Sequence, residues 1–162
     1  MMTNHFSPAV ARRWVLPLLL LCFLTGQLDA TTGRVIKVLP HFLDKEGRHT
    51  LHPSLFERDA YQAVLRANPD KRSGMRFDVQ WKTNGAPAGP LTLKLELRGV
   101  ARGNFPQELT LQQTVQPPKW FAHWTGFKLD EATYNQIGKV TAWRATLWEG
   151  DKMIGRQQSF LW

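Results

Sequence analysis

From residue 75 onward, apolar and polar residues alternate with a period of two in several short runs. Residues 91–98 alternate leucine with polar or charged side chains, and residues 75–82 repeat the pattern around Trp81. Such alternation places successive side chains on opposite faces of a β-strand, so each run predicts a half-buried strand. The segments that we expect to be strands are 34–43, 75–82, 91–98, 109–115, 120–128, 140–148 and 153–161.

A helical period marks the segment between the first two predicted strands. Residues 54–57 (Ser-Leu-Phe-Glu) form a capping box, in which Ser and Glu satisfy the first backbone amides of a helix. We expect this helix to span 55–67 and to end before Pro69, because the residue before a proline avoids helical geometry. Its apolar residues predict one buried face, made of Leu55, Phe56, Ala60, Ala63, Val64 and Ala67.

Seven short strands separated by turns are typical of a β-sandwich. Residues 77–81 (Phe-Asp-Val-Gln-Trp) resemble the second strand of a fibronectin type III domain, in which a core tryptophan ends an alternating run. Residues 129–134 (LDEATY) resemble the corner that enters the sixth strand, and here Asp130 is the expected N-cap of a short helical turn that Gly138 ends.

Over about residues 75–162, the chain thus resembles the immunoglobulin-like and fibronectin type III-like superfamily. The resemblance implies an all-β fold, a seven-stranded immunoglobulin-like β-sandwich. The one α-helix that we expect to be inserted between the first two strands is a departure from the family pattern. It implies binding, adhesion or structural roles more often than catalysis. The chain has a single cysteine, so it departs from antibody-type domains, which carry a cysteine pair.

The N-terminus has the three parts of a secretory signal. Arg12 and Arg13 precede an apolar run at 14–24, and a polar stretch then ends in Ala30. We therefore expect a signal peptide at 1–30, cleavage near Ala30 and one exported domain, periplasmic or secreted, at 31–162. The apolar run is too short to cross a hydrocarbon core of about 30 Å, so we expect no stable membrane anchor after cleavage.

Two other export routes are open to this N-terminus. The Arg12–Arg13 pair loosely resembles a twin-arginine signal, but the strongly apolar run and the absence of a cofactor motif favour the general secretory route. Cys22 would be the acylation site of a lipoprotein, but Leu21 stands where bacterial lipoproteins have a small residue.

Recognisable catalytic chemistry is absent from the sequence. It has no GxSxG, phosphate-binding glycine loop, HExxH or EF-hand motif. His41, His49 and His52 lie close together, but their spacing matches no standard metal site, so we interpret them as solvated loop residues. We predict no cofactor, no metal and no enzymatic activity. A glycan-active enzyme is only a minor alternative, because no pair of carboxylates stands out as the catalytic pair of a glycosidase.

The tryptophans carry the most specific hypothesis. Trp143 and Trp148 are an odd number of residues apart, so an unbulged strand places them on opposite faces, while Trp120 and Trp124 share one face. Some aromatic residues must then lie outside the main core. The helix at 55–67 could cover them as a second small core, which is the interpretation we favour. Otherwise they form an exposed platform, with candidate ligand-binding residues Trp120, Trp124, Trp148 and Arg144.

The net charge of +8 arises from basic residues that are spread along the chain. A nucleic-acid-binding protein would more often concentrate its charge, so we expect no nucleic-acid partner. The leading hypothesis is an exported, non-catalytic binding or structural module that acts through protein–protein contacts, its partner being an unknown protein or an envelope polymer. The alternative is a carbohydrate-binding module that uses exposed tryptophans, with a glycan as ligand.

Overall fold

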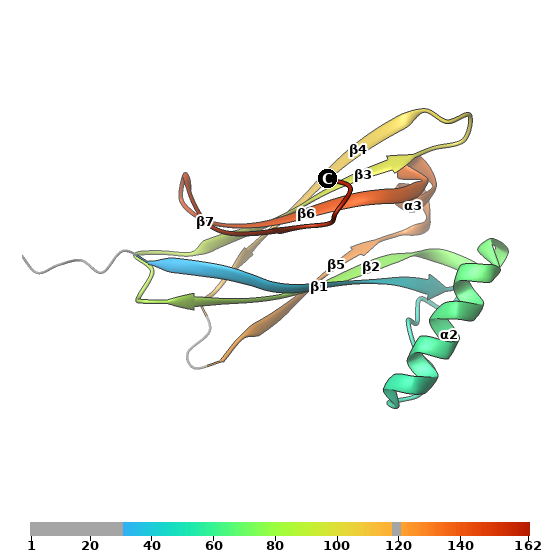
Figure 1. The fold of residues 1–162 in the computed structure, drawn as a ribbon, viewed down its shortest axis with the longest axis horizontal. Coiled ribbons are helices and arrows are strands. Elements are labelled where there is room, and N and C mark those ends of the chain that lie inside the picture. Colours follow the sequence, from blue (N-terminus) through green and yellow to red (C-terminus); the bar gives the residue numbers. More distant parts are fainter. Residues whose placement is uncertain (1–30, 118–120) are drawn as a thin grey trace, which may run out of the picture. The chain divides into compact units, whose positions relative to one another are not determined.

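The computed structural model describes residues 31–117 and 121–162 (Figure 1). The predicted signal peptide at 1–30, with Arg12, Arg13 and Cys22, and the candidate Trp120 lie outside the described residues. The elements in chain order are β1 (Thr32–Asp44), α2 (Leu55–Ala67), the 3-10 turn η2 (Pro69–Lys71), β2 (Arg72–Asn84), β3 (Leu91–Val100), β4 (Pro106–Val115), β5 (His123–Leu129), α3 (Glu131–Ile137), β6 (Lys139–Glu149) and β7 (Lys152–Gln158).

The strands form two antiparallel sheets. One sheet has the order β1-β2-β5 and the other has the order β4-β3-β6-β7. Figure 1 shows the two sheets as separate layers, with α2 and α3 near the same end of the strands. The fold is therefore mostly β, with seven strands and two helices in the described residues, and it is consistent with an immunoglobulin-like sandwich.

The core lies between the two sheets and follows the alternation in the sequence. The leucines of β3 at 91, 93, 95 and 97 are fully buried, as are Phe77, Val79 and Trp81 of β2. The Trp81 indole N–H donates to the Thr125 hydroxyl at 2.9 Å, so its polar atom is satisfied inside the core. Burial of these large side chains is the main stabilising contribution to the fold.

The parity prediction for the tryptophans of β6 is confirmed. Trp143 pairs with Leu97 and packs against the core, whereas Trp148 pairs with Thr92 on the outer face. Most strands extend one to three residues beyond the predicted segments, whereas β5 begins later and β7 ends earlier than predicted. β5 begins at His123 rather than at 120. β7 ends at Gln158; at the next residue, the Ser159 hydroxyl oxygen accepts from the Trp143 backbone N–H, and the Ser159 backbone N–H donates to the Trp143 carbonyl.

The predicted buried face of α2 is wrong. Gln62 and Leu65 are its buried residues, while Leu55, Phe56 and Val64 are exposed, as are Ala60, Ala63 and Ala67. The reason is that β1 is an edge strand with unpaired backbone groups, and Gln62 satisfies them: the Phe42 N–H donates to Gln62 Oε1 at 2.8 Å, and Gln62 Nε2 donates to the Phe42 carbonyl at 3.0 Å. The side of α2 that carries Gln62 therefore faces β1, and the predicted hydrophobic side faces away from it.

The interpretation that α2 covers the outward aromatic residues is also wrong. α2 packs chiefly on β1, close to Phe42, which pairs with Met75 near the start of β2. Trp124 pairs with Gln80, about 17 Å further along β2 at the rise of a strand, and Trp148 belongs to the other sheet.

Within the described residues, neither helix is long and apolar enough to cross a membrane.

Candidate functional site

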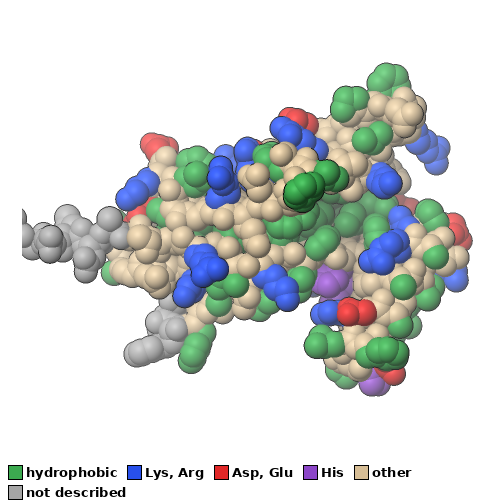
Figure 2. Space-filling model, viewed as in Figure 1, with side chains coloured by type: hydrophobic (Ala, Val, Ile, Leu, Met, Phe, Trp, Pro, Cys, Tyr) green, Lys and Arg blue, Asp and Glu red, His purple; other side chains and the backbone are tan. Residues whose placement is uncertain are grey.

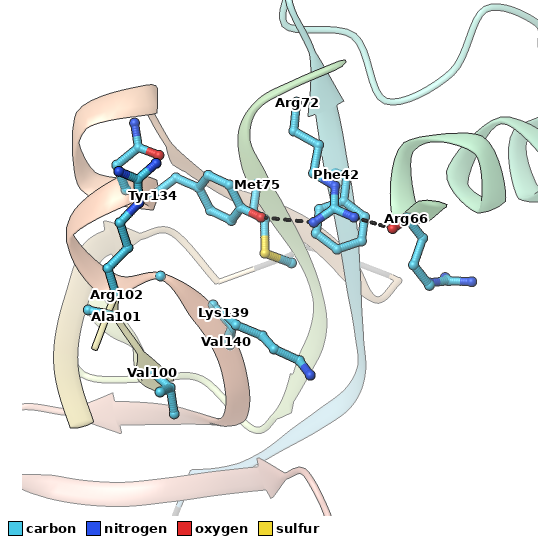
Figure 3. Close-up of a pocket in the computed structure, with 12 residues that line it drawn as sticks. Phe42, Arg66, Arg72, Met75, Val100, Ala101, Arg102, Tyr134, Lys139 and Val140 are labelled. Carbon is cyan, nitrogen blue, oxygen red and sulfur yellow. Dashed lines mark hydrogen bonds between the residues drawn. The ribbon is translucent and has the colours of Figure 1, made fainter. Parts of the chain in front are cut away.

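A cleft of about 710 Å³ opens at the helical end of the sandwich (Figure 3). Its walls come from β1, α2, β2, α3, the β3–β4 loop and the start of β6. Met75, Val100 and Val140 supply apolar lining, and Phe42 and Tyr134 are aromatic. The charged residues of the lining are all basic: Arg66, Arg72, Arg102 and Lys139.

Local sequence signals place the α3 wall of this cleft. The Asp130 carboxylate accepts a hydrogen bond from the Thr133 backbone N–H at 2.9 Å and caps α3, as predicted. The chain leaves α3 through Gly138, whose φ of 70° favours glycine. A Cβ at Gly138 would lie 2.3 Å from the Val100 carbonyl oxygen, so glycine also permits the close approach of α3 and β3.

Arg72 connects the two sides of the cleft. Its guanidinium stacks on the Phe42 ring at 4.1 Å and donates to the backbone carbonyls of Leu65 and Arg66 at the end of α2. It also donates to the Tyr134 hydroxyl at 3.3 Å, and Figure 3 shows this chain of contacts from α3 to α2. The last carbonyls of a helix lack intrahelical donors, so a cationic donor there is stabilising.

The positive charge of the cleft is not balanced locally. Within the described part of the chain, none of the four basic lining residues forms an ion pair with a carboxylate. Arg48, Arg76, Arg98 and Arg144, in contrast, each pair with an acidic side chain. The interpretation of the charge as diffuse is therefore wrong at this end of the molecule.

Asp44 anchors the loop that leads from β1 to α2. Its carboxylate accepts from the Arg48 backbone N–H at 2.8 Å, from Arg48 Nε at 2.8 Å and from the Tyr61 hydroxyl at 2.7 Å. Burial alone would raise the pKa of Asp44, but the hydrogen bonds from Arg48 and Tyr61 outweigh it and hold this pKa below its ordinary value. The carboxylate is therefore an ionised anchor at neutral pH.

The three histidines lie in different surroundings, and the prediction that all are solvated is wrong for His41. His41 is only 7% exposed; its ring lies 5.2 Å from that of His49, and its Nε2 lies 3.8 Å from Asp78. Burial is the first cause that lowers the pKa of His41, and the nearby His49 lowers it further. His52 is exposed and pairs with Glu57 at 2.7 Å. The described residues contain no group of three His, Cys, Asp or Glu side chains suited to a metal ion.

The residues proposed as an aromatic platform do not share one surface. Trp148 and Arg144 lie on the outer face of the four-stranded sheet, and Trp124 lies on the outer face of the other sheet. Arg144 forms two hydrogen bonds of 2.7 Å with Glu96, which lower the pKa of that carboxyl, and its guanidinium stacks on Trp162 at 4.5 Å. The single platform of Trp124, Trp148 and Arg144 is thus corrected to two separate faces.

Sequence reasoning missed two features at the helical end. The first is the basic cleft, because Arg102 and Lys139 are far in sequence from Arg66 and Arg72, and only the fold brings them to one cleft. The second is the α2 patch, which we define as the exposed side chains of Leu51, Leu55, Phe56 and Val64. The helical period did identify most of this patch, but it could not show which way the helix faces.

Comparisons with known proteins add little to the description of this chain. No protein-family model matches the chain, and no curated protein matches it. Among solved structures, the chain is similar to an immunoglobulin-like protein from Pseudomonas aeruginosa, with a TM-score of 0.36 and 14% sequence identity over 82% of this chain and 97% of that one. So few residues are shared that no partner or ligand follows from this likeness.

Proposed function

We propose that this protein is an exported, non-catalytic binding module of the immunoglobulin-like, fibronectin type III-like superfamily, which acts through protein–protein contacts at its helical end. The observation that carries the proposal is the α2 patch. Phe56 is 82% exposed and Leu55 is 66% exposed, although both lie on a helix that is packed against β1 (Figure 2). Figure 2 shows hydrophobic side chains on the outer surface of α2.

The structure of α2 supports a contact role because polar bonds hold the helix in place. Gln62 binds Phe42 and His49, and Tyr61 binds Asp44, so the hydrophobic residues on the other side are not needed as an anchor. Two residues of the patch, Leu51 and Val64, line a hollow of about 290 Å³, whose lining also includes the paired His52 and Glu57. An apolar centre with a polar rim is the usual composition of a protein-binding surface. Burial of one Phe or Leu side chain there would contribute about 1.5–3 kcal/mol.

Site-specific photo-crosslinking in the producing cell tests this proposal. A crosslinking amino acid at Phe56 should yield one dominant protein adduct, and the adduct should disappear when Leu55 and Val64 are changed to Ser. The matched control carries the crosslinker at Phe160, which is fully exposed and lies after β7. Equal adducts at both positions, or none at Phe56, would contradict the proposal. Fractionation of the same cells tests export.

A carbohydrate-binding module is the second candidate. Trp148 lies beside a shallow hollow of about 240 Å³ whose other lining residues include Arg144, Glu96 and Thr146. Aromatic rings next to hydrogen-bonding groups suit sugar rings. However, Lys94 lies 5.2 Å from the Trp148 ring, and Arg144 is already paired with Glu96. A glycan array probed with the wild-type chain and Trp148→Ala separates this candidate from the first, since a sugar ligand requires loss of signal in the variant.

A further inference from the structure

We propose that the basic cleft between α2 and α3 binds an acidic peptide segment, with a carboxylate at the basic rim and a neighbouring apolar side chain on the floor. The inference rests on the proposed function, because it names the chemistry that a protein partner would present at the helical end. It concerns the cleft, which is distinct from the α2 patch.

The first support is unbalanced charge in a confined space. Three arginines and one lysine line the cleft, none forms an ion pair within the described residues, and no acidic side chain is part of the lining. Cations without acidic partners beside a cleft favour an anion that enters it. Arginine suits a carboxylate well because its planar donors match the two oxygen atoms.

The second support is that the central donor is held in position before any ligand binds. Arg72 is fixed by the Phe42 ring, by two carbonyls at the end of α2 and by Tyr134, yet Nη1 and Nη2 each retain an N–H that these contacts do not use. The Tyr134 hydroxyl accepts from Arg72, so its own proton is directed elsewhere. A pre-positioned donor loses little conformational entropy when an anion binds.

The third support is the apolar floor. Met75, Val100 and Val140 line the same cleft as the basic side chains. A phosphate polymer or a sulfated glycan would be recognised by an open line of cations, and it has no apolar group to place on such a floor. A carboxylate that is adjacent to a hydrophobic side chain in a peptide matches both parts of the cleft.

The test is a binding titration of the full domain, residues 31–162, with two capped peptides. One has Asp between two Leu residues, and its twin has Asn in place of Asp. We expect the Asp peptide alone to bind, to shift the NMR signals of residues 101–102 and 138–140, and to weaken with added salt. The double variant Arg102→Glu, Lys139→Glu should lower its affinity by about tenfold or more, since rim charges then repel the carboxylate.

The control variant is Lys152→Glu. Lys152 begins β7 and pairs with Glu149 at the far end of β6, about 33 Å from Lys139. All three reversed side chains are exposed, so the variants should fold. Equal binding of the Asn twin, or equal loss in Lys152→Glu, would overturn the inference. Polyphosphate is the third probe: if it binds in the cleft and the Asp peptide does not, a phosphate polymer replaces the peptide as ligand and the inference is wrong.

The outcomes for the cleft and for the proposed function are distinguishable. Failure of the Asp peptide overturns the acidic segment as ligand, while an adduct at Phe56 would still support protein contact through the α2 patch. Specific peptide binding without any adduct at Phe56 supports the cleft as an acid-binding site and overturns the α2 patch as the contact surface.

Discussion

The sandwich core and the α2 segment (residues 44–72) are held by different forces. Leu93, Leu95 and Leu97 of β3 are buried between two sheets, and the contacts there are apolar. The α2 helix buries one apolar side chain, Leu65. Hydrogen bonds of Gln62 with Phe42 and of Tyr61 with Asp44 connect it to β1. The comparison teaches that a helix anchored through polar bonds can leave its apolar residues free for another molecule. It also predicts that the two regions lose their structure separately.

The largest effect should follow from damage to the core. Leu95→Ala removes a fully buried side chain and should lower the free energy of unfolding by about 2–5 kcal/mol, through lost burial and the cavity left behind. Urea unfolding measured by tryptophan fluorescence checks the value. Leu161→Ala is the control, because Leu161 is largely exposed. A similar loss in both variants would show that the core is not the main source of stability.

The next effect sharpens the comparison, because it should act on α2 alone. Gln62→Ala removes the hydrogen bonds to Phe42 and His49 and leaves partly buried backbone groups without these partners, at a cost of about 1 kcal/mol. We expect proteolytic cleavage within 44–72 to accelerate while the urea midpoint of the sandwich changes little. Val64→Ala, on the exposed side of α2, is the control. A fall in the midpoint as large as that of Leu95→Ala would make α2 part of the core.

A smaller effect is expected from pH through His41. Burial first, and then His49, lower the pKa of His41, while Asp78 opposes them. As pH falls below the ordinary histidine pKa of about 6.5, the unfolded chain takes up a proton that the folded chain does not, so stability decreases until the lower folded pKa is passed. Stability measured between pH 7 and 5 should fall, and His41→Asn should flatten this dependence. An unchanged dependence in His41→Asn would refute the assignment.

The smallest effect on stability is predicted for the α2 patch. Phe56→Ser replaces an exposed side chain and should change the free energy of unfolding by no more than about 0.5 kcal/mol. Thermal unfolding checks this value. A loss of several kcal/mol would mean that Phe56 stabilises the fold itself, and the patch would then no longer be free for a partner.

The sequence was sufficient to predict the strands, because alternation reports which side chains face the core. The Ser54–Glu57 pattern correctly marks the start of α2, but its capping-box bonds are wrong: Ser54 makes no side-chain cap bond, and Glu57 pairs with His52 instead. Asp130 and Gly138 mark the ends of α3. The orientation of α2 could not be predicted, since it depends on Gln62 meeting the unpaired backbone of Phe42 across tertiary distance. Likewise, Arg66, Arg72, Arg102 and Lys139 lie on four separate segments, and no local pattern shows that they converge.

Amide-resolved hydrogen exchange tests the separation of the two regions most directly. The account predicts that amides of α2 exchange through a local opening of low free energy, while amides of β3 and β6 exchange only on global unfolding. Gln62→Ala should accelerate exchange in α2 and leave β3 unchanged. Equal protection of α2 and β3, with an equal response of both to Gln62→Ala, would contradict the account.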